Sequence, residues 1–139
     1  MASMVIVFGE LLVGYCENCC LRIIETTISN IIAMEAPSGG KGAYTLEQIT
    51  DAFQTAFTAF SAAKAESEKS WGKPKKTIIN SGNWGTGAYG GNKVLMATIQ
   101  ILAAVSAQIE QLHFYTVDFE PIIQAQAVFW TFFSCQNRL

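Results

Sequence analysis

The sequence predicts an α/β fold in one layered domain, and three observations support this. The chain has 139 residues, enough for one compact domain that buries about two thirds of its unfolded surface. Hydrophobic residues make up 50% and charged residues only 14%, which excludes intrinsic disorder and coiled coils. Short β-branched segments alternate with segments of helical spacing, and this alternation predicts parallel strands with helices packed on the sheet.

The first half of the chain begins with apolar segments rich in β-branched residues. We expect strands at residues 21–24 and 28–34, and either a helix or a strand at residues 4–13. One proline and three glycines then mark residues 36–44 as a loop. A capping box of Thr45 and Gln48 predicts a helix that runs to about residue 67. Its apolar face is expected to carry Ile49, Phe53, Ala56, Phe57 and Phe60.

The second half predicts a strand, a glycine-rich loop, a helix, a strand and a final helix. These elements are expected at residues 75–80, 81–91, 92–108, 112–117 and 119–133. Ile78 and Ile79 should form the buried centre of the first strand. Pro121 suits the first turn of the last helix, whose dense run of aromatic residues is expected to dock on the sheet.

Charge and cysteine usage restrict the partners and the compartment. Nine basic and eleven acidic residues give a net charge of −2, so we expect no direct nucleic-acid partner and no anionic membrane. No uncharged stretch is as long as the roughly 18 apolar residues of a membrane span. The N-terminus does not read as a signal peptide. Three of the four cysteines are crowded into residues 16–20, unlike a disulfide scaffold, which favours an intracellular location, nuclear or cytoplasmic.

The sequence gives only weak indications of a metal site or of a catalytic nucleophile. Cys16, Cys19 and Cys20 could bind zinc together with Cys135 or His113, since Cys-x-x-Cys is a ligand spacing, but a single such pair favours free thiols. We therefore expect no metal. His113, the only histidine, is assigned to its strand because no nucleophile elbow accompanies it.

The strongest signal for function is the glycine-rich loop between a strand and a helix. Five glycines stand within ten residues, directly before the helix N-terminus. Such a loop can present unpaired backbone N–H groups and the positive end of a helix dipole to one anion, and glycines let the anion approach the backbone. The loop therefore predicts phosphate binding, while a tight turn that binds nothing is the simpler alternative.

Residues 81–102, SGNWGTGAYGGNKVLMATIQIL, resemble the diphosphate-binding segment of the poly(ADP-ribose) glycohydrolase family. The family pattern is G-N-W-G-x-G-A-[FY]-G-G-D, followed by a helix of the form L-x-x-x-I-Q-x-L. The resemblance implies a macrodomain-like fold, with a mixed or parallel sheet flanked by helices, in which residues 1–139 form a single, partial domain. It implies ADP-ribose or poly(ADP-ribose) as the ligand, no cofactor, and binding through Asn83, Gly85, Gly87, Ala88, Tyr89 and Gly90. Trp84 could belong to the site or to the core.

The departures from the family pattern concern catalysis and the adenine end. The family cleaves its glycosidic bond with a segment ending in Gln-Glu-Glu, and these 139 residues contain no such segment. We therefore expect a truncated or degenerate member with no catalytic residue of its own, which hydrolyses only if that segment is supplied from outside. Asn92 replaces the usual Asp. Thr116 or Val117 stands where the family's adenine-stacking ring is expected.

Two other interpretations remain open at this stage. Gly85, Gly87 and Gly90 fit G-x-G-x-x-G, and Asp118 follows the next strand, as in a dinucleotide-binding (NAD) oxidoreductase fragment. Alternatively, the chain is a structural or interaction module whose glycine-rich loop is only a turn. A separate hypothesis is self-association, in which the aromatic terminal helix contributes to an exposed apolar surface.

Overall fold

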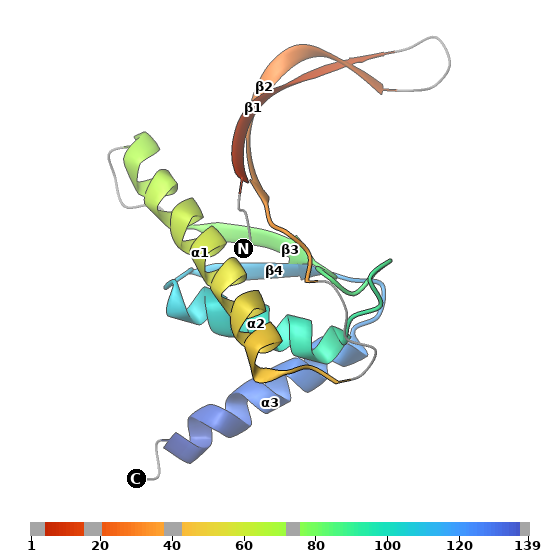
Figure 1. The fold of residues 1–139 in the computed structure, drawn as a ribbon. Helices are drawn as coiled ribbons and strands as arrows, with labels where there is room; N and C mark the ends of the chain where they lie inside the picture. The colour runs from red at the N-terminus through yellow and green to blue at the C-terminus, as the bar shows by residue number, and fades with distance from the viewer. Residues whose placement is uncertain (1–4, 16–20, 38–42, 72–75, 137–139) are drawn as a thin grey trace.

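The computed structural model describes residues 5–15, 21–37, 43–71 and 76–136, and Figure 1 shows how their strands and helices are arranged. The elements follow in the order β1 (Val5–Tyr15), β2 (Leu21–Ala33), α1 (Leu46–Trp71), β3 (Ile78–Gly82), α2 (Lys93–Ser106), β4 (Gln111–Tyr115) and α3 (Glu120–Gln136). Helices packed with a small parallel sheet confirm the predicted α/β fold class.

The first two strands form an antiparallel hairpin that projects away from the helices (Figure 1). The prediction of parallel pairing is therefore wrong for this part of the chain. Only residues 16–20 connect the two strands, whereas a parallel pair needs a crossover of a dozen or more residues. The two strands expected at residues 21–24 and 28–34 are one strand, because Thr26 and Thr27 between them are β-branched and continue it.

The unit β3-α2-β4 has the predicted parallel arrangement. The register pairs Ile78 with Gln111 and Gly82 with Tyr115, and α2 connects the two strands. Ile79 is buried against the helices, but Ile78 is 45% exposed, which corrects the expectation that both are buried. Only one face of this sheet is covered within the described residues. Both strands end at the same edge, where the glycine-rich loop begins.

Helix α1 begins where the sequence predicts and ends later. The capping box at its start is confirmed: Thr45 N donates to Gln48 Oε1 at 2.9 Å, and Gln48 N donates to Thr45 Oγ1 at 3.2 Å. The helix continues to Trp71 because its polar end contains no helix breaker, and Gly72 and Pro74 follow only afterwards.

The core lies between α1, α2 and β3. Alanines on the facing sides of the helices allow the two backbones to approach closely, and few bulky side chains are fully buried. The predicted apolar face of α1 is partly wrong: Phe57 is 37% exposed and stacks on Phe53, with 5.9 Å between ring centroids. The buried residues of this core are Ala52, Ala56, Ala59, Phe60, Ile79, Met96, Ile99, Ala103, Ala104 and Ala107.

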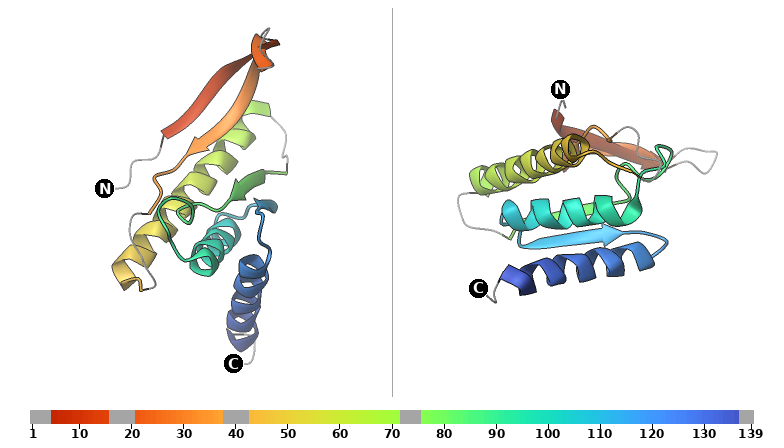
Figure 2. Two further views of the ribbon diagram at one scale, coloured as in Figure 1. Left: turned by 90° about the vertical axis from the view of Figure 1, so that its right-hand side faces the viewer. Right: turned by 60° about the horizontal axis from the view of Figure 1, so that its bottom comes forward.

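Helix α3 packs mainly against α2, and the two helices lie next to each other in the left-hand view of Figure 2. Pro121 lies in its first turn, as predicted. The expected docking of the aromatic run on the sheet is wrong for Trp130, which is 65% exposed. Ile122 and Phe129 of this helix are partly buried, unlike Trp130. In the part of the chain that the structure describes, every helix is too short or too polar to cross a membrane.

Candidate ligand-binding loop

The loop of residues 83–92 connects β3 to α2 at the edge where β3 and β4 both end (Figure 1). In open α/β sheets, ligands bind outside the carboxyl ends of the parallel strands. The fold therefore places the glycine-rich segment where such folds bind their ligands.

A turn of residues 83–86 forms the base of the loop. The carbonyl of Asn83 accepts hydrogen bonds from Thr86 N at 3.3 Å and from Thr86 Oγ1 at 3.2 Å. Gly85 is buried and has a φ of +71°, and a Cβ on it would lie 2.9 Å from Pro37 Cδ. A left-handed backbone without free space requires glycine at this position.

A second set of contacts closes the loop onto the start of α2. Gly91 N donates to the Gly85 carbonyl at 3.1 Å, and a Cβ on Gly91 would collide with that carbonyl. Asn92 N donates to Tyr44 Oη at 2.9 Å, and Asn92 Oδ1 accepts from Leu95 N at 3.0 Å. Asn92 is thus the N-cap of α2, a role in which Asn and Asp are about equally effective.

The tip of the loop, residues 87–90, is exposed. Gly90 N donates to the Gly87 carbonyl at 3.0 Å, and Gly90 has a φ of +66°. A Cβ on Gly87 would meet nothing within 4 Å, and Gly87 has no positive φ. Among the described residues, the backbone N–H groups of Gly87, Ala88 and Tyr89 have no hydrogen-bond partner. The fold thus explains the glycines at 85, 90 and 91 but not the one at 87.

A polar network connects the loop to the end of β4. Asn83 Nδ2 donates to Thr116 Oγ1 at 3.4 Å, and Thr116 Oγ1 donates to the Asp118 carbonyl at 2.9 Å. The Asp118 carboxylate lies 3.5 Å from Lys93 Nζ and accepts from Glu120 N at 3.3 Å. Asp118, the acidic residue of the dinucleotide interpretation, is therefore engaged by the first residues of α2 and α3.

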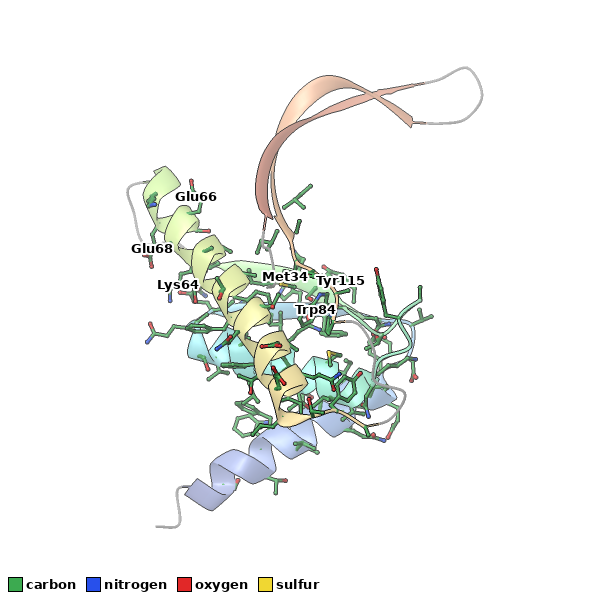
Figure 3. The ribbon with its side chains drawn as sticks, in the orientation of Figure 1. Met34, Lys64, Glu66, Glu68, Trp84 and Tyr115 are labelled. Carbon is green, nitrogen blue, oxygen red and sulfur yellow. The ribbon has the colours of Figure 1, made fainter. Side chains whose placement is uncertain are left out.

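Trp84 has a packing role. Its half-buried ring packs against the core, as does Met34, and both are labelled in Figure 3. Its Nε1 donates to the Glu35 carbonyl at 3.2 Å. Of the two residues at the expected adenine position, Thr116 makes the hydrogen bonds described above and Val117 is 98% exposed.

Two residues for which the sequence predicts no role hold the loop at its ends. Tyr44 bonds the N-cap residue from the segment before α1, and Gln100 in α2 bonds the last residues of β3. Gln100 is the Gln of the quoted helix pattern L-x-x-x-I-Q-x-L, and its place as a polar residue at a core position of an otherwise apolar helix could have indicated a role. Tyr44 carries no such signal, because a tyrosine in a glycine-rich segment is common in turns of any kind.

Glu110, whose pKa is lowered, lies at the end of the sheet opposite the loop. Glu110 Oε2 accepts a hydrogen bond from Thr77 N at 2.8 Å, and this bond is the main reason that the pKa of Glu110 lies below its usual range. Lys64 Nζ lies 3.8 Å from the same carboxylate. This group fastens the start of β3, at the far end of the strand from the loop.

The remaining candidate residues form no site in the described part of the chain. Cys16, Cys19 and Cys20 lie outside the described residues, as does the side chain of Cys135. His113 is exposed on β4, and its Nε2 lies 3.1 Å from Gln111 Oε1. No group of three or more His, Cys, Asp or Glu side chains able to hold a metal occurs among the residues described.

A comparison with known protein families gives a match that includes the loop. The family model described as poly(ADP-ribose) glycohydrolase, with a macro domain fold, matches residues 18–123, well over half of the chain and the whole loop. No curated protein matches the chain. No finding supports the dinucleotide-binding alternative. The chain therefore belongs to the poly(ADP-ribose) glycohydrolase family and has its macro domain type of fold.

Proposed function

We propose that this chain binds ADP-ribose, free or as the end unit of poly(ADP-ribose), through the diphosphate. The observation that carries the proposal is Gly87. Its missing side chain leaves a space that no other part of the described chain fills, next to the N–H groups of Gly87, Ala88 and Tyr89. Three consecutive N–H donors on an open surface suit an anion that reaches the backbone itself.

The electrostatics of the helix support the same ligand. Asn92 caps α2 immediately after the loop, so the positive end of the α2 dipole lies beside the tip. A diphosphate offers several charged oxygens, and hydrogen bonds from N–H groups to charged oxygens are about twice as strong as those to neutral ones. A nearly neutral protein can hold such an anion by local donors, without a basic surface.

Each residue of the proposed site has a distinct role. Asn83 is exposed, and within the described residues its Oδ1 accepts no hydrogen bond, so it can accept one from a ribose hydroxyl. Tyr89 is 61% exposed and can pack on the ribose face. Gly85 is buried and shapes the loop, and Gly90 supplies the turn that holds Ala88 and Tyr89 outward.

We propose that these 139 residues bind poly(ADP-ribose) without hydrolysing it. Hydrolysis of a glycosidic bond needs a carboxylic acid that protonates the leaving oxygen, and the family supplies it from Gln-Glu-Glu. The sequence contains no Gln-Glu-Glu, and no two of its acidic residues are adjacent. A chain with the binding loop alone would recognise the polymer, and hydrolysis would require that segment from another source.

Calorimetry with ADP-ribose tests the binding proposal. We expect weak but measurable binding by the wild type, and affinity at least about tenfold lower for Gly87→Val, which corresponds to about 1.4 kcal/mol. Ala127→Val, an exposed position on α3, serves as a control and should bind like the wild type. The absence of heat from the wild type at millimolar ADP-ribose, or an unchanged affinity of Gly87→Val, would refute the proposal.

Turnover and cofactor specificity are tested separately. Incubation with poly(ADP-ribose) should release no ADP-ribose above a control without protein, and release above that control contradicts binding without turnover. Mixing with NADH should not raise its fluorescence. Enhanced NADH fluorescence with no ADP-ribose binding would instead support the dinucleotide alternative.

A further inference from the structure

Gln100 is a polar residue in the centre of the apolar core. It lies on α2 among Met96, Ile99 and Ala103, and its side chain is 0% exposed. A buried amide that lacks hydrogen bonds would cost free energy, and an aliphatic residue would fill the same space without that cost. The structure shows what the amide does instead.

Both ends of the Gln100 amide hold the last two residues of β3. Nε2 donates to the Gly82 carbonyl at 3.2 Å and to the Met96 carbonyl of its own helix at 3.3 Å. Oε1 accepts a hydrogen bond from Ser81 Oγ. Ser81 and Gly82 are the two residues directly before the ligand-binding loop, so the side chain connects the entry of the loop to the helix that follows it.

The Gly82 carbonyl is the point at which this connection determines the path of the loop. It accepts from Gln100 and also from Trp84 N at 2.7 Å, so its direction sets the first bend of the loop. A Cβ on Gly82 would lie 2.9 Å from the Tyr115 carbonyl, so the strand is already in close contact with β4. Between these two constraints, the peptide that leads into Asn83 has one orientation.

We infer that Gln100 is a positioning residue for the diphosphate loop: it orients the Gly82 carbonyl, and through it the N–H groups at residues 87–89. The expected effect of Gln100 on ligand binding rests on the proposed function. We assign to Gln100 no contact with the ligand. A donor that is buried in the core keeps its geometry independent of solvent, which preorganises the loop before the ligand arrives.

The main test compares Gln100→Met with two control variants. Methionine has a similar length, but its side chain cannot form the hydrogen bonds that the amide donates and accepts. Ala103→Gly weakens α2 without a contact to the loop, and Ser81→Ala removes only the bond to Oε1. The readouts are the melting temperature, ADP-ribose affinity at a temperature where every variant is folded, and the backbone N–H resonances of Gly85, Gly87, Gly90 and Gly91.

We expect Gln100→Met to bind ADP-ribose at least about tenfold more weakly than the wild type, which is the effect of about one hydrogen bond to a charged or well-oriented partner. The resonances of the loop should also shift in this variant. Ala103→Gly should bind like the wild type with those resonances in place, and Ser81→Ala should change affinity less than Gln100→Met. Unchanged affinity of Gln100→Met, or an equal loss in Ala103→Gly, would overturn the inference.

Failure of the inference is distinguishable from failure of the proposed function. If the wild type itself gives no heat with ADP-ribose, the proposed function is wrong, and the loop resonances of Gln100→Met alone decide whether Gln100 positions the loop. Should Gln100→Met not fold, Gln100→Leu replaces it, since leucine packs in an apolar core and also lacks both the donor and the acceptor of the amide. Loop resonances that stay in place in the folded variant would count against the inference.

Discussion

The hydroxyl of Tyr44 accepts a hydrogen bond from the backbone N–H of Asn92 at 2.9 Å. Tyr44 precedes α1 and Asn92 is the N-cap of α2, so this bond fastens two segments that are far apart in the sequence. The first N–H groups of a helix have no partner within the helix, and here a tyrosine supplies one from outside. The start of α2, which borders the proposed site, is therefore held by the segment that begins α1.

Tyr44→Phe should lower the free energy of unfolding by about 0.5 to 1.5 kcal/mol, because it removes one hydrogen bond and keeps the ring. It should also weaken ADP-ribose binding, since the loop loses its attachment at Asn92. Tyr115→Phe is the matched control: its Oη donates to Asn80 Oδ1 at 3.3 Å on the exposed face of the sheet. Urea unfolding and calorimetry measure both effects. Equal losses in the two variants would contradict the special role of Tyr44.

Gly91→Ala should destabilise the protein by about 1 to 3 kcal/mol, the usual cost of forcing an extra methyl group into a packed site. A Cβ there would collide with the Gly85 carbonyl and lie 3.0 Å from Tyr44 Oη. Gly87→Ala, in open space, should leave urea unfolding unchanged. A stable Gly91→Ala variant would show that the bond between Gly91 N and the Gly85 carbonyl does not close the loop.

Gln108→Gly should raise the free energy of unfolding by about 0.5 to 1 kcal/mol. Gln108 has a φ of 55° at the C-terminus of α2, a backbone conformation that glycine adopts more readily. Its N–H donates to the Val105 carbonyl at 3.0 Å, and Ile109 N donates to the Ala104 carbonyl at 2.9 Å, as in a Schellman motif. Gln108→Ala keeps the Cβ and should give no gain in a thermal melt. A lower melting temperature for Gln108→Gly would contradict this assignment.

Lys64, labelled in Figure 3, fastens the same helix end: its Nζ donates to the Gln108 carbonyl at 2.5 Å. This bond uses the backbone of residue 108, so the glycine variant retains it. The expected gain therefore reflects relief of the left-handed backbone alone.

Stability should depend on pH through Glu110. Its pKa is lowered in the folded state, chiefly by the hydrogen bond from Thr77 N, so the folded state favours the ionised carboxylate. The resulting stabilisation is present above the ordinary pKa of glutamate and is lost as the pH falls through the lowered folded-state pKa. Glu110→Gln should therefore destabilise the protein at pH 7 and less so at pH 3, in urea unfolding at both values.

Glu68→Gln on α1 is the control for this pH dependence, since Glu68 is exposed and its carboxylate has no hydrogen-bond or ion-pair partner among the described residues. The difference in free energy of unfolding between Glu68→Gln and the wild type should change less between pH 3 and pH 7. A Glu110→Gln effect that is equal at pH 3 and pH 7 would show that the charge of this carboxylate contributes nothing.

Self-association through α3 stays a prediction. Ile123 and Trp130 are exposed and stand seven residues apart, on one side of the helix, and α3 has no charged residue after Glu120. A second copy could therefore pair with this side without charge repulsion. Light scattering at high concentration should show dimers, which Trp130→Gln should reduce and Thr131→Gln should not. A monomeric wild type would exclude this pairing.

The local elements were predictable where local chemistry decides them. Thr45 and Gln48 identify the start of α1, and the alternation of β3, α2 and β4 predicts their parallel pairing. Where neighbours in space decide, prediction failed. Phe57 has the spacing of a core residue, but the close approach of α1 to α2 buries alanines instead. Ile78 was expected inside, but only one face of the two-stranded sheet is covered.

For the site, the family motif, the glycine-rich loop and the absence of Gln-Glu-Glu follow from residue type and order, so all three can be read from the sequence. Only the tertiary structure separated the glycines that close the loop from Gly87, whose space is open, because that difference depends on which atoms a side chain would meet. The attachments by Tyr44 and Gln100 also required the structure. Each joins residues that are distant in the sequence, and a hydrogen bond forms only where folding brings donor and acceptor together.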